Sequence, residues 1–140
     1  MAGLIYLDAS AIVKLVVEER ESPALRDALR DRPRRVSSAL ALVEVQLAAA
    51  RRSPAPPPGR VRTILAGVTL IPVDQPTLEC AGGLGEYGLR ALDAVHLATA
   101  RSLSEDLETF IAYDHRLSAA ARASGLSTEN RADEGSPARE

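Results

Sequence analysis

Four acidic residues of this chain lie next to or inside apolar segments, where an ionised carboxylate is unfavourable. Asp8 directly follows the apolar run LIYL, and Asp114 follows the run FIAY. Glu44 lies within LALVEVQLAAA, and Asp93 lies within ALDAVHLATA. A carboxylate in apolar surroundings is costly to keep ionised unless it is paired with a positive charge. We therefore expect these four residues to form one site around a cation.

The residue types indicate which cation is expected and which reaction it would serve. Four carboxylates offer only oxygen ligands, without the cysteines or paired histidines typical of zinc, and this favours Mg²⁺ or Mn²⁺. Such an ion polarises a phosphoryl group and lowers the pKa of a bound water. Hydrolysis of a phosphodiester bond is the reaction that fits this combination best.

Three of the acids also have a simpler interpretation as helix caps. Asp8, Asp93 and Asp114 each stand at the possible start of a helical pattern, and Asp is a favoured residue there. Glu44 lies well inside an expected helix, where it cannot cap, and no lysine lies near it. A single shared site explains all four residues together.

The chain alternates between segments typical of strands and segments typical of helices. Short apolar runs predict strands at residues 4–7, 36–37, 68–73, 109–113 and 126–128. Helices are expected directly after residue 8 and at residues 24–30, 39–51, 60–66, 77–87, 92–103 and 115–123. Such alternation is typical of a three-layer α/β domain with a mainly parallel sheet. We assign residues 1–129 to this domain and expect the polar segment 130–140 to be a disordered tail.

This architecture would bring the acids together. In parallel α/β sheets, ligands bind outside the carboxyl ends of the strands. Asp8 and Asp114 both follow a predicted strand, so right-handed crossovers would place them at the same edge. Glu44 and Asp93 lie on predicted helices that could lean over that edge.

The composition is that of a single cytoplasmic domain. The chain has 140 residues, of which 46% are hydrophobic and only 3% aromatic, so we expect an aliphatic core. No apolar run approaches the roughly 18 residues of a membrane span, and the N-terminus does not resemble a signal peptide. The single cysteine cannot form an internal disulfide.

Two groups of arginines could hold a nucleic-acid backbone or could be ordinary solvated residues, and the sequence leaves both interpretations open. The groups are Arg30, Arg32, Arg34 and Arg35, and then Arg51, Arg52, Arg60 and Arg62. Arginine binds phosphate through its planar set of donors. Because aromatic residues are scarce, phosphate contacts rather than stacked bases would have to provide the affinity.

Four further residues are expected to have structural roles. His96 lies one turn after Asp93 and could approach the site, but we interpret it as a histidine packed within its helix layer. Arg116 is expected to form an exposed ion pair, and Lys14 to face the solvent. Cys80 is expected to be a small buried apolar residue.

Four segments of the chain, in this order and spacing, resemble the PIN-domain family: LIYLDASAIVKL, SSALALVEVQLAAA, LRALDAVHLATA and FIAYDHRLSAAARASGL. Within that family they most resemble the VapC-type toxins of type II toxin–antitoxin systems. The resemblance extends from about residue 4 to residue 128. It implies an α/β/α fold around a central, mainly parallel sheet and a ribonuclease activity that depends on Mg²⁺ or Mn²⁺.

The resemblance also implies a role for each acid. Asp8 and Asp93 would be the principal metal ligands, with Ser10 as the small hydroxyl residue that follows the first acid. Glu44 and Asp114 would complete the catalytic cluster and orient or deprotonate the attacking water. The implied partners are an RNA substrate, a cognate VapB-type antitoxin that covers the acidic cleft, and a second copy of the chain in a homodimer.

One residue departs from the family pattern. Members commonly carry Thr or Ser two residues before the last acid, whereas this chain has Ala112 and therefore lacks a hydroxyl that could support Asp114. A catalytically inactive scaffold that binds RNA or protein is one alternative. A phosphatase or phosphoacceptor domain is another, disfavoured because the only lysine is Lys14 and because Ser10 stands where such phosphatases usually have a second Asp.

Overall fold

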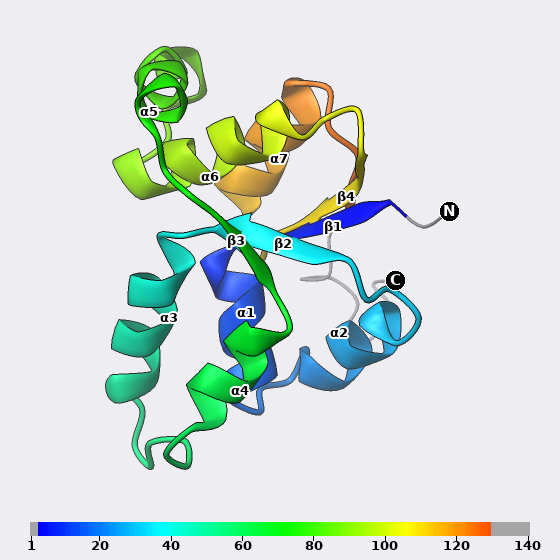
Figure 1. The fold of residues 1–140 in the computed structure, drawn as a ribbon, viewed down its shortest axis with the longest axis vertical. Helices are drawn as coiled ribbons and strands as arrows, with labels where there is room; N and C mark the ends of the chain where they lie inside the picture. The colour runs from blue at the N-terminus through cyan, green and yellow to red at the C-terminus, as the bar shows by residue number, and fades with distance from the viewer. Residues whose placement is uncertain (1–2, 130–140) are drawn as a thin grey trace, which may run out of the picture.

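The computed structural model describes residues 3–129, and its centre is a five-stranded sheet in which all paired strands run parallel (Figure 1). The strands are β1 (Leu4–Leu7), β2 (Arg35–Ser38), β3 (Thr69–Ile71), β4 (Leu107–Ile111) and β5 (Thr128–Glu129). Their order across the sheet is β3-β2-β1-β4-β5. Because β1 is central, its carboxyl end lies between those of β2 and β4.

Helices cover both faces of the sheet and complete a three-layer α/β/α fold (Figure 1). One side carries α1 (Ala9–Val16), α2 (Ser22–Leu29), α3 (Ala41–Ala50) and α4 (Arg60–Ala66). The other side carries α5 (Gln75–Gly82), a short 3-10 helix (Gly85–Tyr87), α6 (Ala91–Ser102) and α7 (His115–Ala123). The fold class expected from the sequence is therefore confirmed.

Each helical layer has its own apolar core, and β1 contributes to both. Ile5 and Leu7 belong to the core beneath α1 to α4, whereas Tyr6 points to the core beneath α6 and α7. This follows from the strand geometry, which directs successive side chains to opposite faces. On the second side, the rings of Tyr6 and Phe110 stack with centroids 5.1 Å apart. The strand that ends at Asp8 is thus fixed by packing on both faces.

The element boundaries lie within about two residues of the predicted ones, except that one predicted helix is divided in two. The strand at residues 4–7 and the helices at residues 60–66 and 115–123 have the predicted bounds. The single helix predicted at residues 77–87 is instead α5 followed by the 3-10 helix. Asp74 caps α5 by accepting a hydrogen bond from the backbone N of Thr77 (3.0 Å), so the helix begins earlier. It ends at a Gly-Gly pair, where helical conformation is least favoured.

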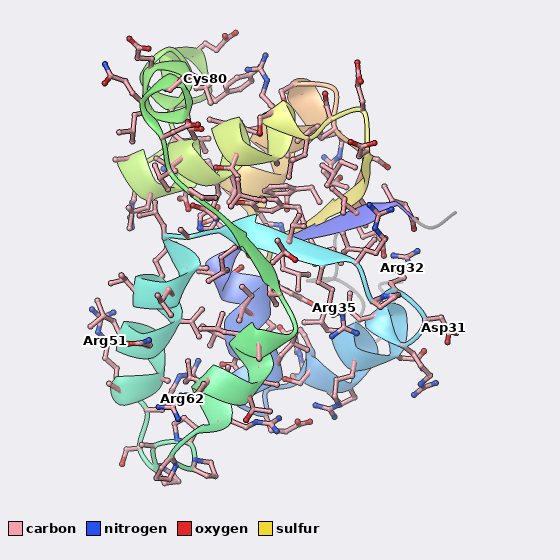
Figure 2. All side chains as sticks on the ribbon, viewed as in Figure 1. Asp31, Arg32, Arg35, Arg51, Arg62 and Cys80 are labelled. Carbon is pink, nitrogen blue, oxygen red and sulfur yellow. The ribbon has the colours of Figure 1, made fainter. Side chains whose placement is uncertain are left out.

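Three smaller observations complete the description. Gly125, two residues after the end of α7, has a φ of 97°, a conformation that favours glycine. Cys80 is exposed rather than buried, so that prediction was wrong (Figure 2). Across residues 3–129, no helix is long and apolar enough to cross a bilayer. The predicted tail at residues 130–140 lies outside the described residues.

Candidate active site

The four acids predicted from the sequence lie toward the carboxyl edge of the sheet. Asp8 immediately follows β1, and Asp114 lies just beyond β4, the neighbour of β1 in the sheet. Glu44 is in the first turn of α3, which follows β2, and Asp93 is in the first turn of α6. The charges of Glu44 and Asp114 both act on Asp93, and the charge of Asp93 acts on Asp8. The structure therefore brings Asp8, Glu44 and Asp114 each within electrostatic reach of Asp93.

Asp8 is the most deeply buried of these acids, with 4% of its surface exposed. It caps α1, because its Oδ1 accepts hydrogen bonds from the backbone N of Ala11 (3.0 Å) and from the hydroxyl of Ser10 (2.7 Å). Burial nevertheless raises the pKa of Asp8 to about 6, although His96 and both hydrogen bonds favour the charged form. Asp8 is thus both a cap and a carboxylate whose charge the protein compensates incompletely.

Ser10 connects the ends of the two central strands. Its hydroxyl donates to Asp8 Oδ1 and accepts a hydrogen bond from the backbone N of Tyr113 at 3.0 Å. Tyr113 directly precedes Asp114, so this one hydroxyl links the segment after β1 to the segment after β4. The small hydroxyl residue singled out in the sequence therefore sets the spacing of two acids.

Asp93 is not a helix cap, because α6 begins two residues before it. Its pKa is raised, first by burial and then by repulsion from Asp114, with a further contribution from Glu44. His96 and Arg90 oppose this shift. Asp93 is therefore the member of the group that interacts with most of the other charges.

Glu44 is held by a histidine rather than by a lysine. Its Oε1 lies 2.7 Å from Nε2 of His96, and Nδ1 of His96 lies 2.7 Å from the hydroxyl of Tyr6. His96 is 1% exposed, so its interpretation as a packed residue is correct. Its direct contact with one of the four acids was not predicted.

Asp114 is exposed and caps α7, since its Oδ1 accepts a hydrogen bond from the backbone N of Leu117 (3.0 Å). Ala112 is fully buried two residues before it. The methyl side chain of Ala112 offers Asp114 no hydrogen-bond donor. Asp114 therefore contributes charge to the site from a solvated position, unlike Asp8.

A cavity of about 410 Å³ opens beside Asp93 and Asp114, and Arg90, His115 and Arg116 form the rest of its lining. Both arginines are exposed. Within residues 3–129, neither Arg90 nor Arg116 forms an ion pair, so the exposed ion pair predicted for Arg116 is not found. Two cationic side chains are thus available next to the acids, and guanidinium groups suit phosphate.

The two arginine groups noted in the sequence lie elsewhere. Arg35 begins β2, so the first group lies at the amino edge of the sheet, opposite the acids (Figure 2). Arg32 pairs there with Glu108 and Glu129. In the second group, Arg52 pairs with Glu19 at 2.6 Å, and Arg60 donates to a backbone carbonyl of α1. For these residues the structure favours a structural role over phosphate binding.

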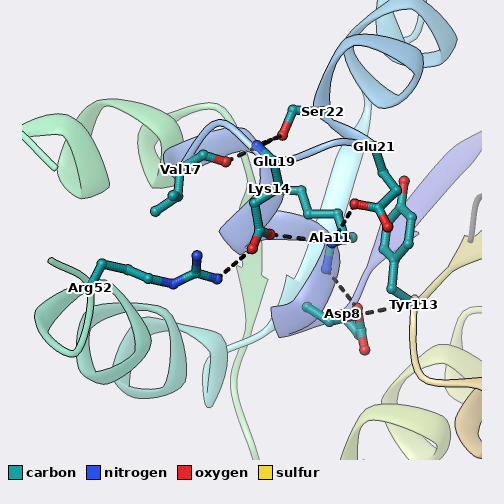
Figure 3. A network of polar contacts seen from close by, with 10 residues as sticks. Asp8, Ala11, Lys14, Val17, Glu19, Glu21, Ser22, Arg52 and Tyr113 are labelled. Atoms are coloured by element: carbon teal, nitrogen blue, oxygen red, sulfur yellow. Dashed lines mark hydrogen bonds and ion pairs between the residues drawn. The ribbon is translucent and has the colours of Figure 1, made fainter. Parts of the chain in front are cut away.

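Lys14 was predicted to face the solvent, but it is largely buried in a polar network (Figure 3). Its Nζ lies 3.2 Å from Glu19 and 3.0 Å from Glu21, and 4.7 Å from the centre of the Tyr113 ring. Glu19 also binds Arg52. The network packs the α1–α2 turn against the residue that precedes Asp114.

The site suits a hard divalent cation better than zinc, because its four acids provide only carboxylate oxygens. Burial is the first cause of the raised pKa of both Asp8 and Asp93, and a cation bound to them would favour their charged forms. In the part of the chain that the structure describes, no three His, Cys, Asp or Glu side chains converge closely enough to enclose a metal. Mg²⁺ does not require such an enclosure, since proteins usually hold it through one or two carboxylates and leave waters in place. Asp8 and Asp93 fit that mode of binding.

Comparison with known proteins gives the family. A model of the PIN domain matches residues 5–123, most of the chain. The chain belongs to the PIN-domain family. This PIN domain is 49% identical over 122 residues to Ribonuclease VapC46 of Mycobacterium tuberculosis, covering 87% of the chain and 93% of the relative. It is 35% identical over 129 residues to Ribonuclease VapC47 of the same species, covering 89% and 95%. These similarities place it with the VapC-type members of the family.

Solved structures agree with this assignment. The PIN domain superposes on a chain of a toxin–antitoxin complex from Klebsiella pneumoniae with a TM-score of 0.63 and 26% identity, covering 79% of this chain and 86% of the other. It matches PAE2754 from Pyrobaculum aerophilum with a TM-score of 0.64 over 91% and 92% of the two chains. The identity to PAE2754 is 21%, so that likeness concerns the fold.

The sequence did not reveal the roles of His96, on α6, and of Arg90, the N-cap of α6, which lie beside the acids. His96 carried a usable signal, because residues three apart lie on the same side of a helix. The spacing did not show that this side faces α3. Arg90 carried no signal, because an isolated arginine before a helix is common on any surface.

Proposed function

We propose that this PIN domain is an endoribonuclease that hydrolyses RNA phosphodiester bonds with Mg²⁺ or Mn²⁺ and acts as the toxin of a toxin–antitoxin pair. The observation that carries the proposal is the group of Asp8, Glu44, Asp93 and Asp114 at the carboxyl edge of the sheet. Asp93 and Asp114 line a cavity that two exposed arginines also line. Acids that can hold a cation, next to arginines that can hold phosphate, suit an RNA backbone. The relatives named as ribonucleases support the same assignment.

The four acids have different roles in the proposed reaction. We assign the metal to Asp8 and Asp93, because burial raises the pKa of both carboxyl groups and a cation bound to them would favour their charged forms. An ion held by these two residues would polarise the phosphoryl group of the substrate and lower the pKa of a bound water. Glu44 is held at Oε1 by His96, and its Oε2 accepts the proton of the attacking water. Asp114 is solvated and orients this water from the opposite helix layer.

Substrate binding falls to the arginines that line the cavity. Arg90 and Arg116 flank Asp93 and Asp114 in sequence and in the cavity. Each can bind a phosphate of the RNA through two parallel N–H donors. Their positive charge offsets the repulsion between the acids and the RNA backbone. They place the scissile phosphate without taking part in proton transfer.

The proposal includes two protein partners and a cytoplasmic location. The antitoxin covers the acidic group and blocks RNA, and the neighbouring reading frame is the candidate for its gene. Co-expression of that neighbour should relieve growth arrest caused by this chain alone, and unrelieved arrest would contradict the pairing.

A second copy of the chain forms a homodimer. The exposed Leu42, Val43 and Leu47 on α3 support a protein contact on that helix, and a monomeric mass by light scattering would exclude the dimer.

The test is cleavage of RNA by the purified protein with and without divalent metal. We expect cleavage with Mg²⁺ or Mn²⁺, none with EDTA, and none by Asp8→Asn or Asp93→Asn. Asp74→Asn is the matched control, because Asp74 also caps a helix with its carboxylate but has a lowered pKa and no acidic neighbour among the causes of its shift. At Asp8 and at Asp74, an Asn side chain can still cap the helix. Cleavage that does not depend on metal, or that is equal in wild type and Asp8→Asn, would contradict the proposal.

A further inference from the structure

A line of hydrogen bonds runs from the central strand to Glu44. The hydroxyl of Tyr6, in β1, lies 2.7 Å from Nδ1 of His96, and Nε2 of His96 lies 2.7 Å from Oε1 of Glu44. Tyr6 is 0% exposed and His96 is 1% exposed, whereas the Glu44 side chain retains 21%. The line therefore begins inside the core and ends at the solvent-accessible carboxylate. It joins β1, α6 and α3, three elements that are far apart in the sequence.

The direction of the outer bond is fixed by Glu44, and that of the inner bond follows the protonation of the His96 ring. An ionised carboxylate can only accept, so Nε2 of the ring carries a proton and donates to Glu44. In the neutral ring, Nδ1 is then an acceptor and the Tyr6 hydroxyl donates to it, whereas in the protonated ring Nδ1 donates to the Tyr6 oxygen. Both nitrogens of the ring are satisfied, as a buried histidine requires.

Aromatic packing holds the inner end of the line rigid. The Tyr6 ring is stacked on Phe110 at an interplanar angle of 9°. It meets the His96 ring edge-on, at 83° and with centroids 5.8 Å apart. The Tyr6 ring cannot tilt without disturbing this core, so the hydroxyl has a fixed position. His96 in turn has one orientation in which both hydrogen bonds form.

We propose that Tyr6 and His96 are positioning residues for Glu44. Tyr6 selects the tautomer and orientation of His96, and His96 holds Oε1 of Glu44, leaving Oε2 to act in the site. Glu44 needs such support because the charge of Asp93 repels it and because a glutamate side chain has several rotatable bonds. Residues that orient a catalytic or ligating group from behind commonly change activity or metal affinity about 10–100-fold when lost. The inference rests on the function proposed above for Glu44.

The first test concerns the hydrogen bonds between Tyr6, His96 and Glu44, and it requires no enzymatic activity. The ¹⁵N shifts of the His96 ring in the metal-free protein at neutral pH report which nitrogen carries the proton. For the neutral form of the ring, we expect the Nε2–H tautomer in the wild type and a mixture of tautomers in Tyr6→Phe, which lacks only the hydroxyl. A neutral wild-type ring that carries its proton on Nδ1, or a neutral Tyr6→Phe ring identical to the wild-type ring, would overturn the proposal.

The second test concerns the effect on the reaction. We expect His96→Leu to lower kcat about 10–100-fold with a smaller change in KM, because substrate-binding groups are untouched. His96→Gln, whose amide N–H can still donate to Glu44, should recover most of the loss, and Tyr6→Phe should fall between them. Ser22→Ala is the control, since Ser22 is a buried hydroxyl on α2 that contacts none of these residues. Thermal unfolding followed by circular dichroism identifies any variant that fails to fold.

The outcomes separate the two proposals. If the wild-type protein does not cleave RNA, the proposed function is wrong. The ¹⁵N shifts of the His96 ring still show whether Tyr6, His96 and Glu44 are connected by hydrogen bonds as proposed. An active wild type with an equally active, folded His96→Leu overturns the positioning role alone. Should His96→Leu not fold, Tyr6→Phe carries the test, and a loss in this variant no larger than the loss in Ser22→Ala would contradict the proposal.

Discussion

At the scale of single residues, the acids of this PIN domain are distinguished by surroundings rather than by type. Asp8 and Asp114 are both helix caps at the ends of neighbouring strands. Asp8 is buried and its pKa is raised to about 6, whereas Asp114 is exposed. The capping and site interpretations, which compete when only the sequence is known, are compatible in the structure. One carboxylate oxygen is used by the cap, and the other is available to the site.

The raised pKa of Asp8 makes a prediction about stability and pH. The folded protein binds this proton more tightly than the unfolded chain does, because the pKa rises from 3.8 to about 6 on folding. The contribution of Asp8 to the free energy of unfolding therefore falls as pH rises from about 4 through about 6, and it is constant at higher pH. In EDTA, Asp8→Asn should be more stable than wild type at pH 8 by on the order of 1–3 kcal/mol. The two proteins should converge at pH 4.

Urea unfolding at pH 4, 6 and 8 measures this difference. Asn keeps the cap on α1, so loss of the cap does not confuse the comparison. Asp93 also has a raised pKa but is present in both proteins, so the difference between them isolates Asp8. An Asp8→Asn protein less stable than wild type at pH 8 would show that the Asp8 charge is already compensated without metal.

At the scale of elements, the sequence was enough to predict the frame of the site. The strand LIYL and the helix that follows Asp8 are encoded by local pattern, because apolar runs and helix caps act over a few residues. The sheet edge then follows from the topology of parallel sheets. The contacts between elements could not be predicted. Whether His96 faces α3, and whether Lys14 folds back onto Tyr113, depends on the packing of segments far apart in sequence.

Ser10 tests whether the ends of β1 and β4 are coupled. Ser10→Ala removes the 2.7 Å hydrogen bond to Asp8 and leaves the Tyr113 N–H without this acceptor. We expect a loss of about 1–3 kcal/mol in the free energy of unfolding, because two hydrogen bonds of the Ser10 hydroxyl are lost, one of them to a carboxylate. Ribonuclease activity should fall as well, since the spacing of Asp8 and Asp114 relaxes.

Ser124→Ala provides the comparison for this change. The Ser124 hydroxyl donates one hydrogen bond, to the backbone carbonyl of Ala121 in the last turn of α7. Its removal should leave activity unchanged and cost less stability than the loss of Ser10. Equal effects of the two substitutions on activity would mean that Ser10 does not link the two strand ends.

At the scale of the whole molecule, charge is distributed by edge. The net charge is only −2, so no overall field attracts RNA. The arginines at the amino edge of the sheet pair with acids such as Glu108 and Glu129 and stabilise the fold there. At the carboxyl edge, Arg90 and Arg116 stand beside acids that lack such partners. The carboxyl edge of the sheet thus combines acids that can bind a cation with arginines that can bind phosphate.

The central claim is that these acids hold a divalent cation, and calorimetric titration with Mn²⁺ at pH 7.5 tests it most directly. We predict binding to the wild type and to Asp74→Asn. Asp8→Asn and Asp93→Asn should each bind at least about tenfold more weakly, a loss no smaller than that caused by removing a residue that merely supports a ligand. Absence of binding to the wild type, or equal binding by wild type and Asp8→Asn, would contradict the claim.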